Sequence, residues 1–164
     1  MSLKLALTVS TLLISASFAQ AKNFTLPAKG PMVTIEVPDD WNPQTDGKAM
    51  EGTSSDGKLF IRADIVQSKN LEDATLGAVK YLEDKGVKIT HRNPIKDMQI
   101  NGMKGFNLQM QGSDSIGPAQ VSLSIFPSKD AQRWVMVTLW GDETIEGQNM
   151  DGLGGILDSL KLAN

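Results

Sequence analysis

Few side chains in this sequence could carry out chemistry, and the first of them is a histidine. His91 is the only histidine, and the chain has no cysteine. Thiolate catalysis, disulfides, iron–sulfur clusters and cysteine-ligated zinc are therefore excluded, and one histidine cannot form a two-histidine metal site within the chain. His91 is in phase with Val87 and Ile89, which predicts a place at the edge of a buried strand face. Because no G-x-S-x-G nucleophile motif accompanies it, a structural role is favoured over a catalytic or ligand-binding one.

Two groups of acidic residues are the next candidates, because carboxylates in loops are the ligands that Ca²⁺ prefers. The first group flanks a loop with proline and glycine, and the second precedes the last predicted helix. Neither has the D-x-[DN]-x-[DN]-G spacing of a calcium loop, and the second more simply places negative charge at the positive end of a helix. We predict no metal, no cofactor and no catalytic residue. The two groups are Asp39, Asp40 and Asp46, and Asp142, Glu143 and Glu146.

Three tryptophans are the remaining candidates. Trp134 and Trp140 have strand spacing, which indicates packing within a sheet, whereas Trp41 lies beside a polar loop. Aromatic side chains dominate the energetics of protein interfaces, so Trp41 is a candidate anchor for a partner. The residues that we predict for partner or ligand contact are Trp41, Asp40, His91 and Trp140.

The first 21 residues have the three regions of a secretory signal peptide. Lys4 precedes an apolar stretch from Leu5 to Phe18, and Ala19-Gln20-Ala21 forms an A-x-A cleavage site. An uncleaved anchor is the alternative, but the apolar stretch is shorter than the roughly 20 residues needed to span a bilayer. We predict a cleaved segment 1–21 and a single domain 22–164, soluble in the bacterial periplasm and with no stable membrane insertion.

Composition and charge limit the classes of partner. The chain has 164 residues, of which 40% are hydrophobic and 21% charged, as in a globular protein. The formal net charge is −3, and the acidic residues are scattered along the chain. Such a balance disfavours nucleic acid as a partner.

The elements that must position these residues are mostly strands. Residues 48–53 and 58–66 predict a hairpin, and the polar stretch 42–47 is expected to lack regular structure. The run 134–140 is apolar on both faces and should lie inside the sheet. Alternating patterns predict further strands at 33–37, 87–92, 98–100, 106–110 and 121–125.

Two helices complete the prediction. Residues 71–85 have helical spacing, with Asn70 as N-cap. Residues 144–162 also have it but contain four glycines, so this helix must gain its order from packing, with the glycines allowing close approach. Together the elements predict the α+β class: an α/β/α sandwich with a central antiparallel sheet and helices on its faces.

Three short motifs resemble the PsbP-like superfamily. They are Met32–Pro38 followed by Trp41, Ile100–Phe106, and Ile156–Lys161. The resemblance implies the same α/β/α sandwich and a binding or assembly role, without an assigned reaction. The closest resemblance is to small bacterial DcrB-type envelope proteins, from which this chain departs in lacking a lipid-acceptor cysteine.

These observations favour a non-enzymatic adaptor or assembly factor that binds another envelope protein. The alternative is a carrier of a small apolar ligand, with a pocket between the sheet and the C-terminal helix lined by Met110, Met136 or Trp140. An enzyme is the third hypothesis, and it would need a cleft that brings His91 together with two acidic residues.

Overall fold

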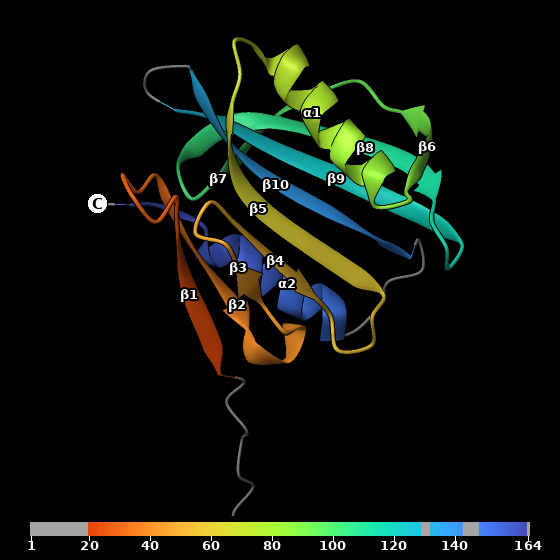
Figure 1. Ribbon diagram of the computed structural model, residues 1–164, viewed down its shortest axis with the longest axis horizontal. Coiled ribbons are helices and arrows are strands. Elements are labelled where there is room, and N and C mark those ends of the chain that lie inside the picture. The colour runs from red at the N-terminus through yellow and green to blue at the C-terminus, as the bar shows by residue number, and fades with distance from the viewer. Residues whose placement is uncertain (1–19, 129–131, 143–147, 164) are drawn as a thin grey trace, which may run out of the picture.

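The structure is a computed structural model that describes residues 20–128, 132–142 and 148–163, with residues 148–151 described by their backbone alone (Figure 1). Most of the predicted signal peptide therefore lies outside the described residues. The first strand already includes Ala21, the last residue of that segment. Across the described part of the chain, no helix has both the length and the apolar character required to cross a membrane.

A large antiparallel sheet forms the centre of the fold. Seven of its strands follow the order β3-β4-β5-β10-β9-β8-β6, and β7 pairs with the first half of β8. As predicted, the doubly apolar strand β10 lies inside the sheet, between β5 and β9. The strands are β3 (Gln44–Thr45), β4 (Ala49–Thr53), β5 (Leu59–Gln67), β6 (Lys88–Arg92), β7 (Lys96–Ile100), β8 (Met103–Ser113), β9 (Pro118–Pro127) and β10 (Arg133–Asp142).

Different layers cover the two faces of this sheet (Figure 1). Helix α1 (Leu71–Asp84) packs on one face, and the side chain of Asn70 accepts a hydrogen bond from the Asp73 amide at 2.8 Å, which confirms the predicted N-cap. The other face carries helix α2 (Gln148–Ser159) and a three-stranded sheet of order β1-β2-β11. These strands are β1 (Ala21–Leu26), β2 (Val33–Pro38) and β11 (Lys161–Leu162), and the short helix η1 (Asp39–Trp41) follows β2.

The central antiparallel sheet was predicted, but the second sheet was not. The strand expected at 33–37 exists, although it pairs with β1 and β11 rather than with the large sheet. Residues 42–47, expected to lack regular structure, contain the two-residue strand β3. The C-terminal helix ends at Ser159, three residues before the predicted end, because the chain then pairs with β2.

The turn between β7 and β8 fixes the end of α2. Asn101 Nδ2 donates to the carbonyl oxygens of Asp158 and Leu160, each at 2.8 Å. Asn101 also has a φ of 49°, a left-handed conformation that asparagine tolerates better than most residues. A side chain from a distant hairpin thus satisfies carbonyls that the helix leaves without a partner.

We expect Asn101→Ala to lower the free energy of unfolding by about 2–3 kcal/mol, because it removes two hydrogen bonds and strains the left-handed backbone. Asn101→Gly keeps the backbone conformation and removes only the hydrogen bonds, so its loss should be about half as large. Urea unfolding followed by circular dichroism measures both values. Two variants as stable as the parent protein would contradict this role of Asn101.

Candidate functional site

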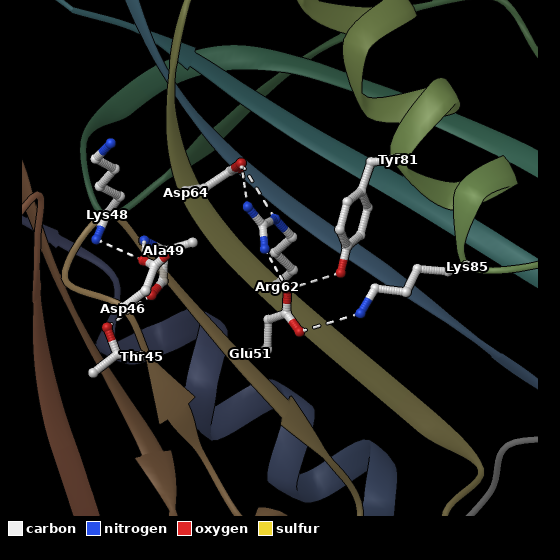
Figure 2. Close-up of polar contacts among 9 residues, drawn as sticks. All are labelled: Thr45, Asp46, Lys48, Ala49, Glu51, Arg62, Asp64, Tyr81 and Lys85. Carbon is white, nitrogen blue, oxygen red and sulfur yellow. Dashed lines mark hydrogen bonds and ion pairs between the residues drawn. The ribbon is translucent and has the colours of Figure 1, made fainter.

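Five side chains form a cluster of charges on the α1 face of β4 and β5 (Figure 2). The alternation of β5 explains their position: Leu59, Ile61 and Ala63 belong to the core beneath α2, so the intervening residues point toward α1. Above them lie a tyrosine from the last turn of α1 and the lysine that caps the C-terminal end of this helix. We call this group the charged cluster; it consists of Glu51, Arg62, Asp64, Tyr81 and Lys85.

Arg62 joins the two carboxylates of the charged cluster. Its Nη1 contacts Glu51 Oε1, while its Nη2 and Nε lie 3.1 and 3.3 Å from Asp64 Oδ2. Tyr81 donates its hydroxyl to Glu51 Oε1 at 2.8 Å, and Lys85 Nζ lies 3.6 Å from Glu51 Oε2. The guanidinium also stacks 4.5 Å from the centre of the Tyr81 ring, in a cation–π contact. Charge-assisted hydrogen bonds of this kind are stronger than neutral ones, so the cluster holds its side chains in one arrangement.

The environment shifts the acidities of the cluster in opposite directions. Burial opposes ionisation of Glu51, but the Tyr81 hydroxyl and the charges of Lys85 and Arg62 together lower its pKa. Burial raises the pKa of Asp64 despite the neighbouring Arg62. Burial and the hydrogen bond to Glu51 raise the pKa of Tyr81, so its hydroxyl remains a donor at neutral pH. The cluster therefore combines fixed charges with a hydroxyl that donates a hydrogen bond.

These shifts predict a pH dependence of stability with a defined sign. Glu51 stabilises the fold above its ordinary pKa of 4.5, and this contribution is lost as the pH falls through its lower folded pKa. Asp64 acts in the opposite sense. Its stabilising contribution is present below pH 3.8, its ordinary pKa, and is lost as the pH rises through its higher folded pKa. We therefore expect Glu51→Gln to reduce the stability lost between about pH 6 and pH 3, and Asp64→Asn to increase it.

Urea unfolding at a series of pH values measures this difference, and Asp97→Asn, in β7 outside the cluster, is the control. If both cluster variants follow the parent curve, the pair does not govern acid stability.

An aromatic hollow of about 220 Å³ adjoins the charged cluster. The rings of Phe60 and Trp140 stack with centroids 3.7 Å apart, and Tyr81 meets Trp140 edge-on at 6.5 Å. Lys85 lines the hollow and also belongs to the charged cluster, so the two form one surface. Ile116, in the turn between β8 and β9, lines the hollow and is 71% exposed. We call Phe60, Trp140, Ile116 and their polar neighbours Lys58, Lys85 and Asp114 the aromatic hollow.

The structure does not bring the four predicted contact residues together. Trp140 lies in the aromatic hollow and is partly exposed. Asp40 is exposed in η1, but Trp41 beside it is only 3% exposed and belongs to the core between the two sheets. Its indole packs against Gly152, where an added Cβ would lie 3.4 Å from the ring, so the expected close approach of a helix glycine occurs here. It does not occur at Gly154 or Gly155, where an added Cβ would meet nothing within 4 Å. Trp41 thus has almost no surface to offer a partner in this conformation.

His91 is exposed rather than at the edge of a buried face. Between Ile89 and His91 the pairing of β6 with β8 shifts register, so the alternation that starts at Val87 does not continue to His91. The imidazole Nε2 lies 3.2 Å from Asn93 Oδ1. This strand is at the opposite edge of the large sheet from β3 and β4, so His91 is remote from the charged cluster.

The acidic candidates are separated as well. Asp46 Oδ1 accepts the backbone amides of Lys48 and Ala49 at 2.8 and 2.9 Å (Figure 2), and these hydrogen bonds lower its pKa. Asp39 lies 3.7 Å from Lys22 Nζ. Of the second group, Asp142 lines the aromatic hollow, while Glu143 and Glu146 lie outside the described residues. Among the residues that the structure describes, no three His, Cys, Asp or Glu side chains gather as a metal site would require.

The predicted lining of a ligand pocket beneath the C-terminal helix is wrong. Met110 and Met136 are each 1% exposed and fill the core under α1, on the face of the sheet away from α2. Trp140 packs against that same core. Conversely, the sequence reasoning did not single out Glu51, Arg62 or Tyr81, although Arg62 and Asp64, two residues apart on one strand, are the signal that could have identified them.

Comparisons with known proteins identify the fold. No family model matches this sequence, and no curated protein matches it. Among solved structures, cyanobacterial PsbP (CyanoP) of Synechocystis superposes with a TM-score of 0.59 at 10% identity, over 91% of this chain and 96% of that one. LpqN of Mycobacterium tuberculosis, described as involved in cell envelope biogenesis, gives 0.52 at 14% identity, over 88% and 92%. The Ran-binding protein Mog1p of Saccharomyces cerevisiae gives 0.52 at 11% identity, over 87% and 96%.

At these identities the likeness concerns the fold, which is PsbP-like and, over the described residues, mostly antiparallel sheet with the helices α1 and α2. The chain also resembles a Bacteroides thetaiotaomicron protein, of whose length it spans about half, 49%.

Proposed function

We propose that this chain is a non-enzymatic protein of the bacterial periplasm, close to the DcrB-type envelope proteins, that binds another envelope protein as an adaptor or assembly factor. The N-terminal pattern over residues 1–21 supports export and cleavage of that segment. Two structures of similar fold support the kind of role: LpqN is involved in cell envelope biogenesis, and Mog1p is Ran-binding.

The observation that carries the proposal is Ile116, 71% exposed beside the partly exposed ring of Trp140. Binding energy at protein interfaces concentrates in a few aromatic and arginine side chains within well-packed hollows. The aromatic hollow supplies Phe60 and Trp140, and the adjoining charged cluster supplies Arg62 and Tyr81. A partner that covers Ile116 would remove a large apolar side chain from water and reach fixed charges at its rim.

Site-specific photo-cross-linking in living cells tests this surface. A photoreactive residue at 116 should form one dominant adduct with an envelope protein, and Trp140→Ala should abolish it. The matched control position is Leu76, which is also apolar and 51% exposed but lies on α1 outside the aromatic hollow. Equal adducts from both positions, or an adduct insensitive to Trp140→Ala in a stably folded variant, would contradict the proposal.

A further inference from the structure

A second hollow, which shares no lining residue with the aromatic hollow, opens beside β11. Its volume is about 550 Å³, within the roughly 300–1,000 Å³ of small-molecule sites. The residues just before β2, the β7–β8 turn with the start of β8, the facing ends of β9 and β10, and β11 surround it. We call it the β11 cleft.

The floor of the β11 cleft is the edge of the hydrophobic core. Met103, Phe126 and Val135 line the cleft and also belong to the core between the two sheets. At the lip, Leu162 is 61% exposed, although exposure of an apolar side chain to water is unfavourable. Pro31, Met32 and Pro127 also line the cleft and, like Leu162, are exposed or partly exposed, so they are apolar surface that the cleft can offer to an alkyl chain.

The charge of the lining has one sign. Lys104 and Arg133 line the cleft, and no acidic side chain does so among the described residues. Lys104 is exposed and makes no ion pair with any residue that the structure describes. An apolar cleft with a cationic rim is complementary to a ligand with an alkyl chain and an anionic head.

We infer that the β11 cleft binds a single-chain anionic amphiphile of the fatty-acid class, with the alkyl chain against Met32, Pro127 and Leu162 and the carboxylate beside Lys104. This site is separate from the aromatic hollow, and it does not depend on the proposed protein partner. It also differs from the pocket expected from the sequence, because it adjoins β11 and the β7–β8 turn rather than Met110, Met136 or Trp140.

Isothermal titration calorimetry tests the inference, on protein expressed from the full chain with residues 1–21 included. Sodium laurate below its micelle concentration should bind with a 1:1 stoichiometry, at least tenfold more tightly than dodecyltrimethylammonium, which has the same chain and a positive head. Shortening the chain to decanoate should weaken binding about fifteenfold, since two fewer methylenes are buried. Lys104→Gln should weaken laurate several-fold and leave dodecanol unchanged.

A pair of matched variants locates the site. Leu162→Glu puts a carboxylate at the lip and should weaken laurate binding at least tenfold. Ile116→Glu, a comparable change at another exposed apolar side chain, should leave laurate binding unchanged and disrupt the cross-link at the aromatic hollow. Both positions are exposed, so both variants should fold, and thermal unfolding verifies this. Equal binding of the two head charges, or laurate binding that survives Leu162→Glu, would overturn the inference. Sedimentation with phosphatidylglycerol vesicles without binding of monomeric laurate would also overturn it, in favour of a membrane-surface contact.

Discussion

Gly105→Ala should lower the free energy of unfolding by about 3 kcal/mol or more, because β8 has no room for a Cβ at this position. An added Cβ would lie 2.3 Å from the carbonyl oxygen of Ile125 and 2.6 Å from Cδ1 of Phe126. The first of these atoms belongs to the backbone of the paired strand β9, which cannot move without disturbing the ladder between β8 and β9. Neither neighbour is the end of a flexible side chain, so neither can move aside easily to relieve the clash.

Gly77→Ala is the matched control for this effect. Gly77 lies within α1, where an added Cβ meets nothing within 4 Å, and alanine favours the helix over glycine by about 1 kcal/mol. We therefore expect this variant to be slightly more stable than the parent protein. Urea unfolding measures both variants, and an unchanged midpoint for Gly105→Ala would contradict the close approach of β8 and β9 at this position.

Local patterns were sufficient for the elements whose order depends on their own residues. Residues 134–140 are apolar on both faces, and this predicted the central position of β10. Asn70 and the helical spacing that follows predicted α1, since an N-cap acts within one turn. The hairpin of β4 and β5 followed from its glycine-containing turn.

The second sheet could not be predicted in this way, because its strands pair across almost the whole chain. Leu162 pairs with Val33, and Ser159 Oγ accepts the Glu36 amide at 2.8 Å, 123 residues away in the sequence. A two-residue strand such as β11 has no alternation to detect. Separation along the chain also explains the wrong prediction for Trp41. Its polar neighbours in the sequence indicate exposure, but Gly152 of α2, more than a hundred residues away, packs against the ring.

The sequence indicates only part of the charged cluster. Alternation places Arg62 and Asp64 on the same face of β5. Because both residues are charged, the pattern indicates that this face is exposed to solvent. The structure places α1 above this face, with Tyr81 and Lys85 at the edge of the covered region. The position of a helix over a sheet depends on tertiary packing, so the partners of Arg62 follow only from the fold.

We expect Arg62→Met to destabilise the protein by about 2–3 kcal/mol at neutral pH, because it leaves two carboxylates without their shared cation. Removal of one partner from a buried ion pair costs about 3–5 kcal/mol, and the partial exposure of these side chains reduces that value. Asp64 is the main source of the loss, since burial already raises its pKa and its side chain is only 20% exposed. The methionine retains the apolar contact with Tyr81, so the change tests charge more than volume.

The pH dependence separates this explanation from a simple packing defect. Without Arg62, both carboxylates should gain protons more readily, so the deficit of Arg62→Met should shrink as the pH falls toward 4, whereas a packing defect would persist. The double variant Arg62→Met/Asp64→Asn should recover at least half of the loss at neutral pH, because the uncompensated charge is then absent. The stability of Arg62→Lys, which keeps the charge but not the paired hydrogen bonds to Asp64, should fall between those of the parent protein and Arg62→Met.

Urea unfolding of the four proteins at pH 7 and pH 4 gives these values. A deficit that is independent of pH and unaffected by Asp64→Asn would assign Arg62 to packing, and the charged cluster would then lose its place as a preorganised rim of the aromatic hollow.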